Sequence, residues 1–185
     1  MKVKFGLSNV HIAKLTEDAE GNITYGKPFP LKGAVKLNTD PEGEKVAFKA
    51  DNITYYNSVN NQGYTGDLEV ALVNKEFLKD ILGRIEDSNG ALFENADDVI
   101  SRFALMGEIE GDVQKRRFIY YDCVAGRPST EDKTVEDSKE PNTETINISM
   151  NPRTSDHMVK CDIERNETNK TVFDAFYESV YEKAA

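Results

Sequence analysis

The sequence predicts a mainly β chain, an antiparallel sandwich or barrel with one short internal helix and a helical segment near the C-terminus. Apolar and polar residues alternate over many short segments, which is the period of strands buried on one face. Turn residues separate these segments. No regular alternation of strands with helices is visible, which argues against a parallel, nucleotide-binding α/β fold. A chain of 185 residues fits one domain with projecting loops.

Strands are expected where the alternation is uninterrupted, and turns where Gly, Pro, Asn and Asp gather. The expected strands cover residues 10–15, 34–37, 45–49, 102–110, 118–124 and 144–150. The turn signals between them are Glu20-Gly21-Asn22, Asp40-Pro41-Glu42-Gly43, Ser88-Asn89-Gly90 and Glu110-Gly111-Asp112.

The segment from Asp67 to Gly83 predicts a further strand and the internal helix. Asn74 is suited to cap the helix, and Gly83 follows it where a left-handed residue is favoured. A helix this short must pack against a sheet, so we expect it to cover one end of the core and not to form an active site. The apolar positions are Leu68, Val70 and Leu72 on one strand face, then Phe77, Leu78, Ile81 and Leu82 on the helix; Asp67, Glu69 and Ala71 take the other strand face.

Beyond Pro152 the pattern changes, and we divide the chain into a β domain, residues 1–153, and a C-terminal arm, residues 154–185. Residues 157–163 could form one last strand before a polar linker. Helical spacing then places six apolar residues on one broad stripe, which must dock either on its own domain or on a neighbouring subunit. These six are Val172, Phe173, Phe176, Tyr177, Val180 and Tyr181.

Two stretches are expected to be extended loops, near residues 40–66 and 127–143. The charged segment 127–141 has almost no large apolar residue and is bracketed by prolines, which is typical of an exposed loop. In residues 49–66, Tyr55, Tyr56 and Tyr64 stand among Asn, Ser and Gly. Such tyrosines are enriched in interfaces, although they could equally fringe a mobile loop.

Composition and motifs argue against enzymatic chemistry. The 33 acidic residues exceed the 23 basic ones and give a net charge of −10, which disfavours a surface that grips nucleic acid. The basic run Lys115-Arg116-Arg117 reads as the end of a hairpin. His11, His157 and the two cysteines suggest no triad, disulfide or metal site, and no phosphate-binding glycine loop is present. We therefore expect no catalytic residue, cofactor or metal, and neither a signal peptide nor a membrane span.

Several segments, in their order and spacing, resemble the major tail proteins, or tail tube proteins, of siphophages and prophages of Gram-positive bacteria. They are VKFGLSNVHIAKLTED, KGAVKLNTDPEGEKVAFKADNITYY, the stretch from Asn60 to Asn89, AGRPSTEDKTVEDSKEPNTETINISMNPR and the final VFDAFYESVY. The resemblance implies a virion protein, assembled in the host cytoplasm, whose hexameric rings stack into a tube. It also implies a tape-measure protein, a tail terminator and a distal tail protein as partners, with double-stranded DNA passing through unbound.

In that interpretation the functional residues are assembly surfaces and passive charges. An acidic lumen would repel DNA phosphates. Deleting the loop 127–141 should leave a folded monomer that cannot extend a tube. The candidates for subunit interfaces are Tyr55, Tyr56, Tyr64, Arg127, Glu131, Asp132, Lys133, Phe173, Phe176 and Tyr177; those for the lumen, which could instead face outer solvent, are Asp67, Glu69, Glu108 and Glu110.

Two alternatives stay open at the level of sequence. One is another phage structural protein, such as a contractile-tail tube or a head-tail connector. The other is a monomeric sandwich that binds a carbohydrate or peptide. The aromatic groove that it needs could come from Tyr55, Tyr56, Tyr64, Tyr120 and Tyr121.

Overall fold

A computed structural model describes residues 3–111, 114–134 and 141–184, and it is mainly β, with 49% strand and 6% helix. One large antiparallel sheet carries the strand order β2-β1-β10-β11-β13-β7-β4, and β3, β12 and β14 pair with β1, β13 and β11. The strands are β1 (Lys4–Glu17), β2 (Ile23–Tyr25), β3 (Phe29–Pro30), β4 (Ala34–Glu42), β5 (Lys45–Ala50), β6 (Ile53–Val59), β7 (Gly63–Val70), β8 (Ile85–Glu86), β9 (Leu92–Phe93), β10 (Phe103–Gly111), β11 (Arg116–Ala125), β12 (Ser129–Thr130), β13 (Glu144–Asn151) and β14 (Lys160–Glu164); the helices are α1 (Lys75–Asp80) and α2 (Lys170–Asp174).

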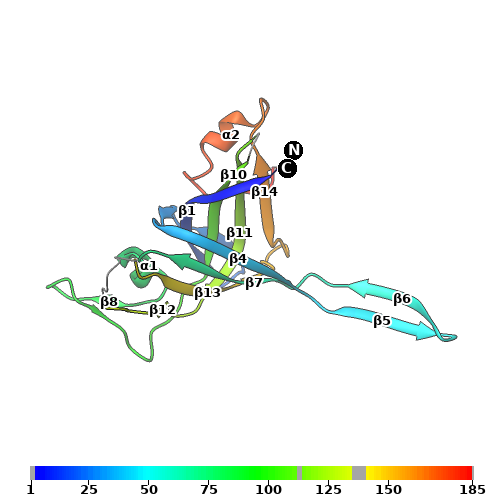
Figure 1. The fold of residues 1–185 in the computed structure, drawn as a ribbon, viewed down its shortest axis with the longest axis horizontal. Helices are drawn as coiled ribbons and strands as arrows, with labels where there is room; N and C mark the ends of the chain where they lie inside the picture. The colour runs from blue at the N-terminus through cyan, green and yellow to red at the C-terminus, as the bar shows by residue number, and fades with distance from the viewer. Residues whose placement is uncertain (1–2, 112–113, 135–140, 185) are drawn as a thin grey trace.

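The sheet divides along β11, and this division creates the layers of the fold. The first half of β11 pairs with β14, whereas residues 122–125 pair with β13, which continues through β7 to β4. The main core lies between β1, β10 and β11 on one side and β7 and β13 on the other (Figure 1). The antiparallel, mainly β prediction is therefore confirmed, and a sandwich is compatible with this arrangement.

The strand β10 is buried on both faces, which explains its nearly continuous apolar sequence. Phe103 and Leu105 enter the main core, whereas Ala104 and Met106 belong to a second cluster on the opposite face. All four side chains are 0% exposed. The face of β10 that carries Ala104 and Met106 is turned away from the main core. Phe176 and Val180 of the C-terminal segment cover this face.

The internal helix forms as the sequence predicts. The side chain of Asn74 accepts a hydrogen bond from the Phe77 backbone N–H at 2.9 Å, and Gly83 has the expected left-handed conformation with φ of 76°. Phe77 and Ile81 are 0% exposed in the core. The expectation for Leu72 is wrong: β7 ends at Val70, so the alternation stops before Leu72, which is 68% exposed.

The C-terminal segment docks on its own domain, and its helix is much shorter than the apolar stripe suggests. β14 pairs with β11, and Phe176 and Val180 pack in the second cluster, so the described part of the C-terminal segment, residues 154–184, packs on the β domain. α2 covers five residues and has no side-chain N-cap bond. The Phe173 carbonyl accepts a hydrogen bond from Arg117 and, at 3.3 Å, one from the Phe176 N–H three residues on, a 3₁₀-type bond that ends the regular helix.

The expected loop between residues 49 and 66 is instead a long two-stranded ribbon, made by β5 and β6. It projects along the longest axis of the molecule, away from all other elements (Figure 1). Asp51 and Asn52 form its tip with φ of 53° and 61°, the two positive values that a tight hairpin turn requires. The alternation at residues 45–49 correctly predicts a strand. The turn at Asp51-Asn52 and the return strand β6 were not predicted.

Candidate assembly surfaces

The β5–β6 ribbon is amphipathic, with one apolar face that is open to solvent. Opposed residues of an antiparallel pair share a face, and Val46 opposes Ser58 while Phe48 opposes Tyr56. Ile53 returns to this same face beyond a register shift. The four large side chains, Val46, Phe48, Ile53 and Tyr56, are 54–63% exposed, and the opposite face carries Ala47, Lys49, Thr54 and Asn57, with Val59 at its base.

The base of the ribbon is fixed to the domain. The Asn60 N–H donates to the Glu44 carbonyl at 3.2 Å, and the Gln62 N–H donates to the Glu42 carbonyl at 3.0 Å. The Asn60 side chain accepts from the Glu44 N–H at 2.5 Å. A Cβ on Gly43 would lie 2.1 Å from the Asn60 carbonyl oxygen, so glycine permits this close crossing. The ribbon is thus a continuation of β4 and β7.

The predicted interface tyrosines separate into two groups. Tyr55, at the register shift, and Tyr56 are 74% and 59% exposed on the ribbon. Tyr64 lies instead in β7, where its ring packs edge-on against Tyr120 with centroids 5.5 Å apart. Tyr120 and Tyr121 are buried, so the five tyrosines do not line a common groove. This arrangement contradicts the aromatic groove that the monomeric binding-module alternative requires.

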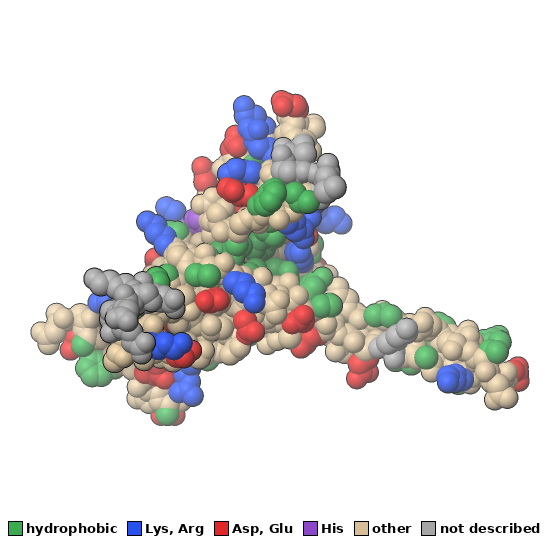
Figure 2. Space-filling model, in the orientation of Figure 1, with side chains coloured by type: hydrophobic (Ala, Val, Ile, Leu, Met, Phe, Trp, Pro, Cys, Tyr) green, Lys and Arg blue, Asp and Glu red, His purple; other side chains and the backbone are tan. Residues whose placement is uncertain are grey.

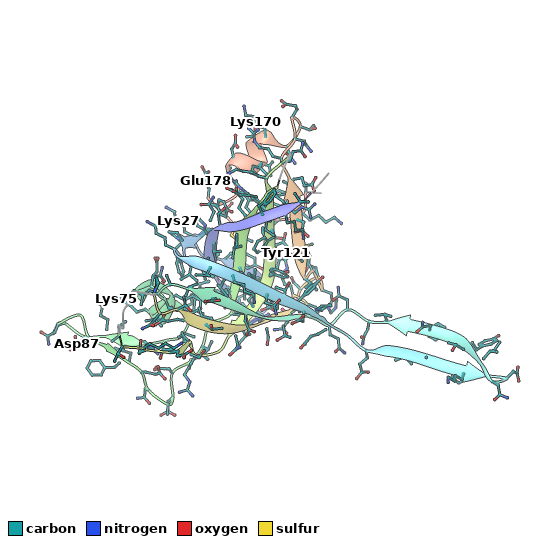
Figure 3. All side chains as sticks on the ribbon, in the orientation of Figure 1. Lys27, Lys75, Asp87, Tyr121, Lys170 and Glu178 are labelled. Atoms are coloured by element: carbon teal, nitrogen blue, oxygen red, sulfur yellow. The ribbon has the colours of Figure 1, made fainter. Side chains whose placement is uncertain are left out.

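A second projecting surface, which we call the lobe, comprises residues 84–100 around β8 and β9. Ile85 and Phe93 oppose each other in this small hairpin and are 66% and 58% exposed. The lobe lies at the end of the molecule opposite the ribbon, as the positions of β8 and of Asp87 show (Figures 1 and 3). Hydrophobic side chains are visible at both ends in the space-filling view (Figure 2).

Ion pairs brace the lobe against the domain. Glu86 contacts Lys75 at 3.3 Å and Lys79 at 2.7 Å, and Glu94 pairs with Arg84 and, at 3.1 Å, with Arg127. Arg127, an interface candidate, therefore lies beside the lobe. Between them is an open groove of about 470 Å³, lined by Leu82, Arg84, Glu94, Asn95, Ala96, Asp98, Ile100, Gly126 and Arg127.

The other candidates of the 127–141 loop are exposed. Glu131, Asp132 and Lys133 follow the short strand β12, and Glu131 pairs with Lys133 at 3.0 Å while both remain largely in solvent. Residues 135–140 of this loop lie outside the described residues.

The strands β4, β7 and β13 present a polar face away from the core. Asp67 lies in register between Asn38 and Asn147, and its carboxylate accepts a hydrogen bond from the Asn147 side chain. Glu69 lies between Lys36 and Thr145 and accepts from the Thr143 hydroxyl at 2.8 Å. Asp67 is exposed and Glu69 half-buried. We call this surface the polar sheet face; it comprises Lys36, Asn38, Asp40, Thr65, Asp67, Glu69, Thr145, Asn147 and Ser149.

Glu108 does not lie on an open surface, which corrects its assignment to the lumen. It is 0% exposed, and it accepts hydrogen bonds from Arg117 at 2.8 Å, Lys115 at 2.9 Å and Asn9 at 3.3 Å. Burial by itself raises the pKa of Glu108, but the bonds from Arg117 and Lys115 outweigh it and hold the pKa below its usual range. Of the two lumen candidates on this strand, Glu110 alone is exposed.

Phe173, Phe176 and Tyr177 pack within the chain, which corrects their assignment to a subunit interface. Phe173 and Phe176 are 2% and 1% exposed, and Tyr177 is half-buried. The guanidinium of Arg117 lies 4.0 Å from the centre of the Phe173 ring and 4.7 Å from that of Tyr177. Their aromatic stripe identified a buried surface correctly, but the partner is the domain's own sheet.

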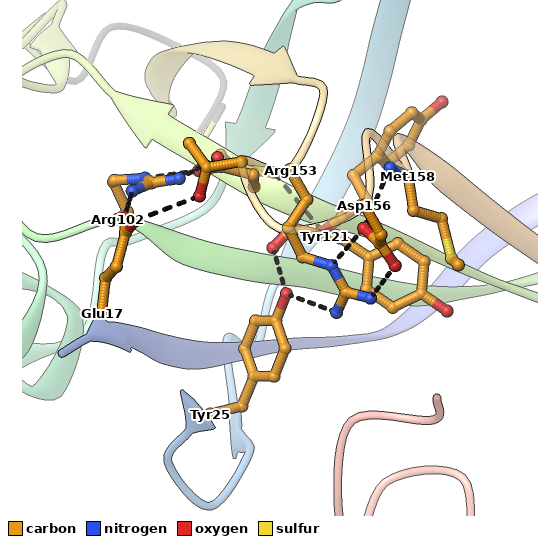
Figure 4. Close-up of polar contacts among 11 residues, drawn as sticks. Glu17, Tyr25, Arg102, Tyr121, Arg153, Asp156 and Met158 are labelled. Atoms are coloured by element: carbon orange, nitrogen blue, oxygen red, sulfur yellow. Dashed lines mark hydrogen bonds and ion pairs between the residues drawn. The ribbon is translucent and has the colours of Figure 1, made fainter. Parts of the chain in front are cut away.

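A polar network that the sequence did not predict fixes the end of the C-terminal segment. Figure 4 shows the part of it in which Arg153 contacts Asp156 and Tyr25. Arg153 is 5% exposed and forms paired hydrogen bonds with Asp156, at 2.6 and 2.9 Å, and with Glu182, at 2.6 and 2.9 Å. Arg153 lowers the pKa of Asp156 to about 2, and burial raises that of Tyr25 to about 12. The Tyr121 hydroxyl donates to the Tyr181 carbonyl at 2.8 Å. The sequence around Arg153 contains no pattern that predicts Asp156 and Glu182 as its partners.

Within the described residues, no group of three or more His, Cys, Asp or Glu side chains is placed to hold a metal ion, and no helix is long and apolar enough to cross a membrane. His11 stacks on Tyr177 with ring centres 4.2 Å apart. Cys123 is buried, which raises the pKa of its thiol. Comparison with models of known protein families gave no match, and no curated protein is significantly similar to the chain.

Proposed function

We propose that this protein is a self-assembling structural subunit, the major tail tube protein of a long-tailed phage or prophage. The observation that carries the proposal is the β5–β6 ribbon, whose apolar face has no partner within the described chain. Burying a large apolar side chain contributes about 1.5–3 kcal/mol, and an isolated two-stranded hairpin is marginal in water. A surface of this kind is explained by a neighbouring subunit that covers it.

Two further features support assembly into a tube. β4 forms one edge of the large sheet, and an open edge can pair with a strand of another subunit. The polar sheet face carries Asp40, Asp67 and Glu69 against Lys36. In a ring of copies this face would repel DNA phosphates, as passage of the genome requires. The proposed partners are further copies, arranged as stacked hexameric rings, and then the tape-measure, terminator and distal tail proteins of a virion assembled in the host cytoplasm.

The test is electron microscopy of the purified protein at rising concentration, together with its oligomeric mass. We expect rings or hollow tubes, either from the protein alone or after addition of a tail-initiation complex. A protein that stays monomeric under both conditions would contradict the proposed function.

A variant without the ribbon tests whether the ribbon is needed for assembly but not for folding. In this variant a two-residue Asn-Gly turn replaces residues 45–59 and joins Glu44 to Asn60, whose backbones are already hydrogen-bonded. We expect a folded monomer with a nearly unchanged melting temperature and no rings or tubes. The matched control, Thr54→Gln with Asn57→Gln on the other ribbon face, keeps the ribbon's charge and should still assemble. Tubes formed by the ribbonless protein would show that the ribbon is dispensable.

A further inference from the structure

We propose that the ribbon of one copy docks, through its apolar face, on the lobe of a second copy around Ile85 and Phe93. This inference rests on the proposed function, because it identifies the partner surface of the assembling subunit. Both surfaces expose opposed pairs of large apolar side chains: Phe48 with Tyr56 on the ribbon, and Ile85 with Phe93 on the lobe.

Position determines how the two surfaces can meet. The ribbon and the lobe lie at opposite ends of the longest axis, so one copy cannot bring its own ribbon to its own lobe (Figure 1). A contact between two ribbons would leave the lobe uncovered. A head-to-tail contact covers both surfaces, and because each copy then still has one free ribbon or lobe, the contact repeats into rings or filaments.

Charge favours the same pairing. Of the five carboxylates in the lobe segment 84–98, Glu86 and Glu94 are paired with Lys75, Lys79, Arg84 and Arg127, and Asp87, Asp97 and Asp98 add further negative charge. The ribbon segment 45–59 contains two lysines against one aspartate. The ribbon is therefore net positive in a chain of net charge −10. Complementary charges around an apolar contact steer association and disfavour the contact of two lobes, which would bring like charges together.

The lobe also offers a recess. The groove of about 470 Å³ lies beside it, and its lining combines the apolar Leu82, Ala96 and Ile100 with the ion-paired Arg84, Glu94 and Arg127. A mixture of apolar and charged side chains is compatible with a protein interface. The groove can receive a large side chain of the ribbon's apolar face, such as Tyr56, which is 59% exposed.

Two variants of the full chain test the contact. The ribbon variant, Phe48→Glu with Tyr56→Glu, retains an intact lobe; the lobe variant, Ile85→Glu with Phe93→Glu, retains an intact ribbon. All four side chains are at least 57% exposed, so the folds should survive, which circular dichroism and thermal unfolding can verify. Each variant alone should stay monomeric. An equal mixture should give a 1:1 heterodimer in analytical ultracentrifugation, and no larger species, because one compatible ribbon and lobe remain.

Other outcomes overturn the proposal. Self-association of the lobe variant would indicate contact between two ribbons, and a mixture that stays monomeric would show that the ribbon does not bind the lobe. The matched control, Thr54→Gln with Asn57→Gln, keeps an intact ribbon and lobe and the ribbon's charge, so by itself it should associate as the wild type does. If wild-type protein forms tubes but the mixture gives no heterodimer, this inference fails while the proposed function stands. Failure of the wild type to form tubes under any condition counts against the function itself.

Discussion

Glu108 joins three strands through a buried charge. Its carboxylate is held by Arg117 and Lys115 of the β10–β11 hairpin and by Asn9 of β1. Arg117 in turn contacts the Phe173 ring and carbonyl. One buried glutamate therefore orients the arginine that fixes the C-terminal segment, and the acidic side chain serves the fold and not an open surface.

Replacing Glu108 with glutamine should destabilise the monomer by about 3 kcal/mol, because it leaves the charge of Arg117 without its buried partner. The folded state lowers the pKa of Glu108 from its usual 4.5. The stabilisation from this group is therefore complete above the unfolded-state pKa and is lost as the pH falls from about 4.5 through the folded-state pKa. Denaturant unfolding at several pH values should show a weaker acid dependence in E108Q; an identical pH dependence of the two proteins would contradict this role.

At the scale of elements, the C-terminal segment and the ribbon reach opposite outcomes from similar apolar patterns. The segment after Asn169 packs Phe176 and Val180 against Ala104 and Met106. Arg153 and Tyr121 hold its end by hydrogen bonds. The ribbon has no comparable partner within the described chain. Buried apolar surface therefore makes the C-terminal segment part of the monomer, whereas the apolar face of the ribbon stays exposed, as the proposed assembly requires.

Phe176→Ala should destabilise the monomer by about 3–5 kcal/mol, because the side chain is 1% exposed and its loss opens a cavity over β10. Val172→Ala provides the matched control, since Val172 is 39% exposed on the same segment and should change stability by less than about 1 kcal/mol. Equilibrium unfolding in urea measures both changes. If both substitutions lower the free energy of unfolding by the same small amount, the C-terminal segment contributes little packing energy against β10.

At the scale of the whole molecule, the two projecting ends and the polar sheet face define three distinct surfaces. The ribbon and the lobe are apolar and lie far apart (Figure 1). The polar sheet face, on β4, β7 and β13, has an excess of carboxylates. In the proposed tube, contacts between copies use the first two surfaces, and the third is the wall that DNA passes.

Asp40→Lys with Asp67→Lys should convert this wall into one that binds DNA. We expect wild-type tubes to retain no duplex DNA at low salt, and the variant tubes to retain it with a steep decrease as salt rises, because each phosphate contact releases counterions. A filter-binding titration measures this. The control makes the same charge change on the C-terminal segment, at Glu167 and Glu178, both exposed. If the control tubes retain DNA and the Asp40→Lys, Asp67→Lys tubes do not, the lumen is lined by the side of the molecule that carries the C-terminal segment and not by the polar sheet face.

Much of the fold followed from local patterns. Alternation located β1, β4, β5, β10, β11 and β13, because a strand buried on one face repeats every two residues. Asn74 and Gly83 fixed the ends of the internal helix through backbone hydrogen bonding and a left-handed residue, both of which are local. Composition also predicted the exposure of residues 131–134, a described part of the loop that follows β12.

What the sequence determined by itself was therefore the mainly β class, most strands, the capped helix and the acidic balance. The tertiary structure decided which apolar residues find a partner. Phe173 and Phe176 are buried, Phe48 and Tyr56 are exposed, and Glu108 lies inside an ion pair. The physical reason is that burial depends on contacts between residues far apart in the chain, as between Phe176 and Met106, which no local spacing records.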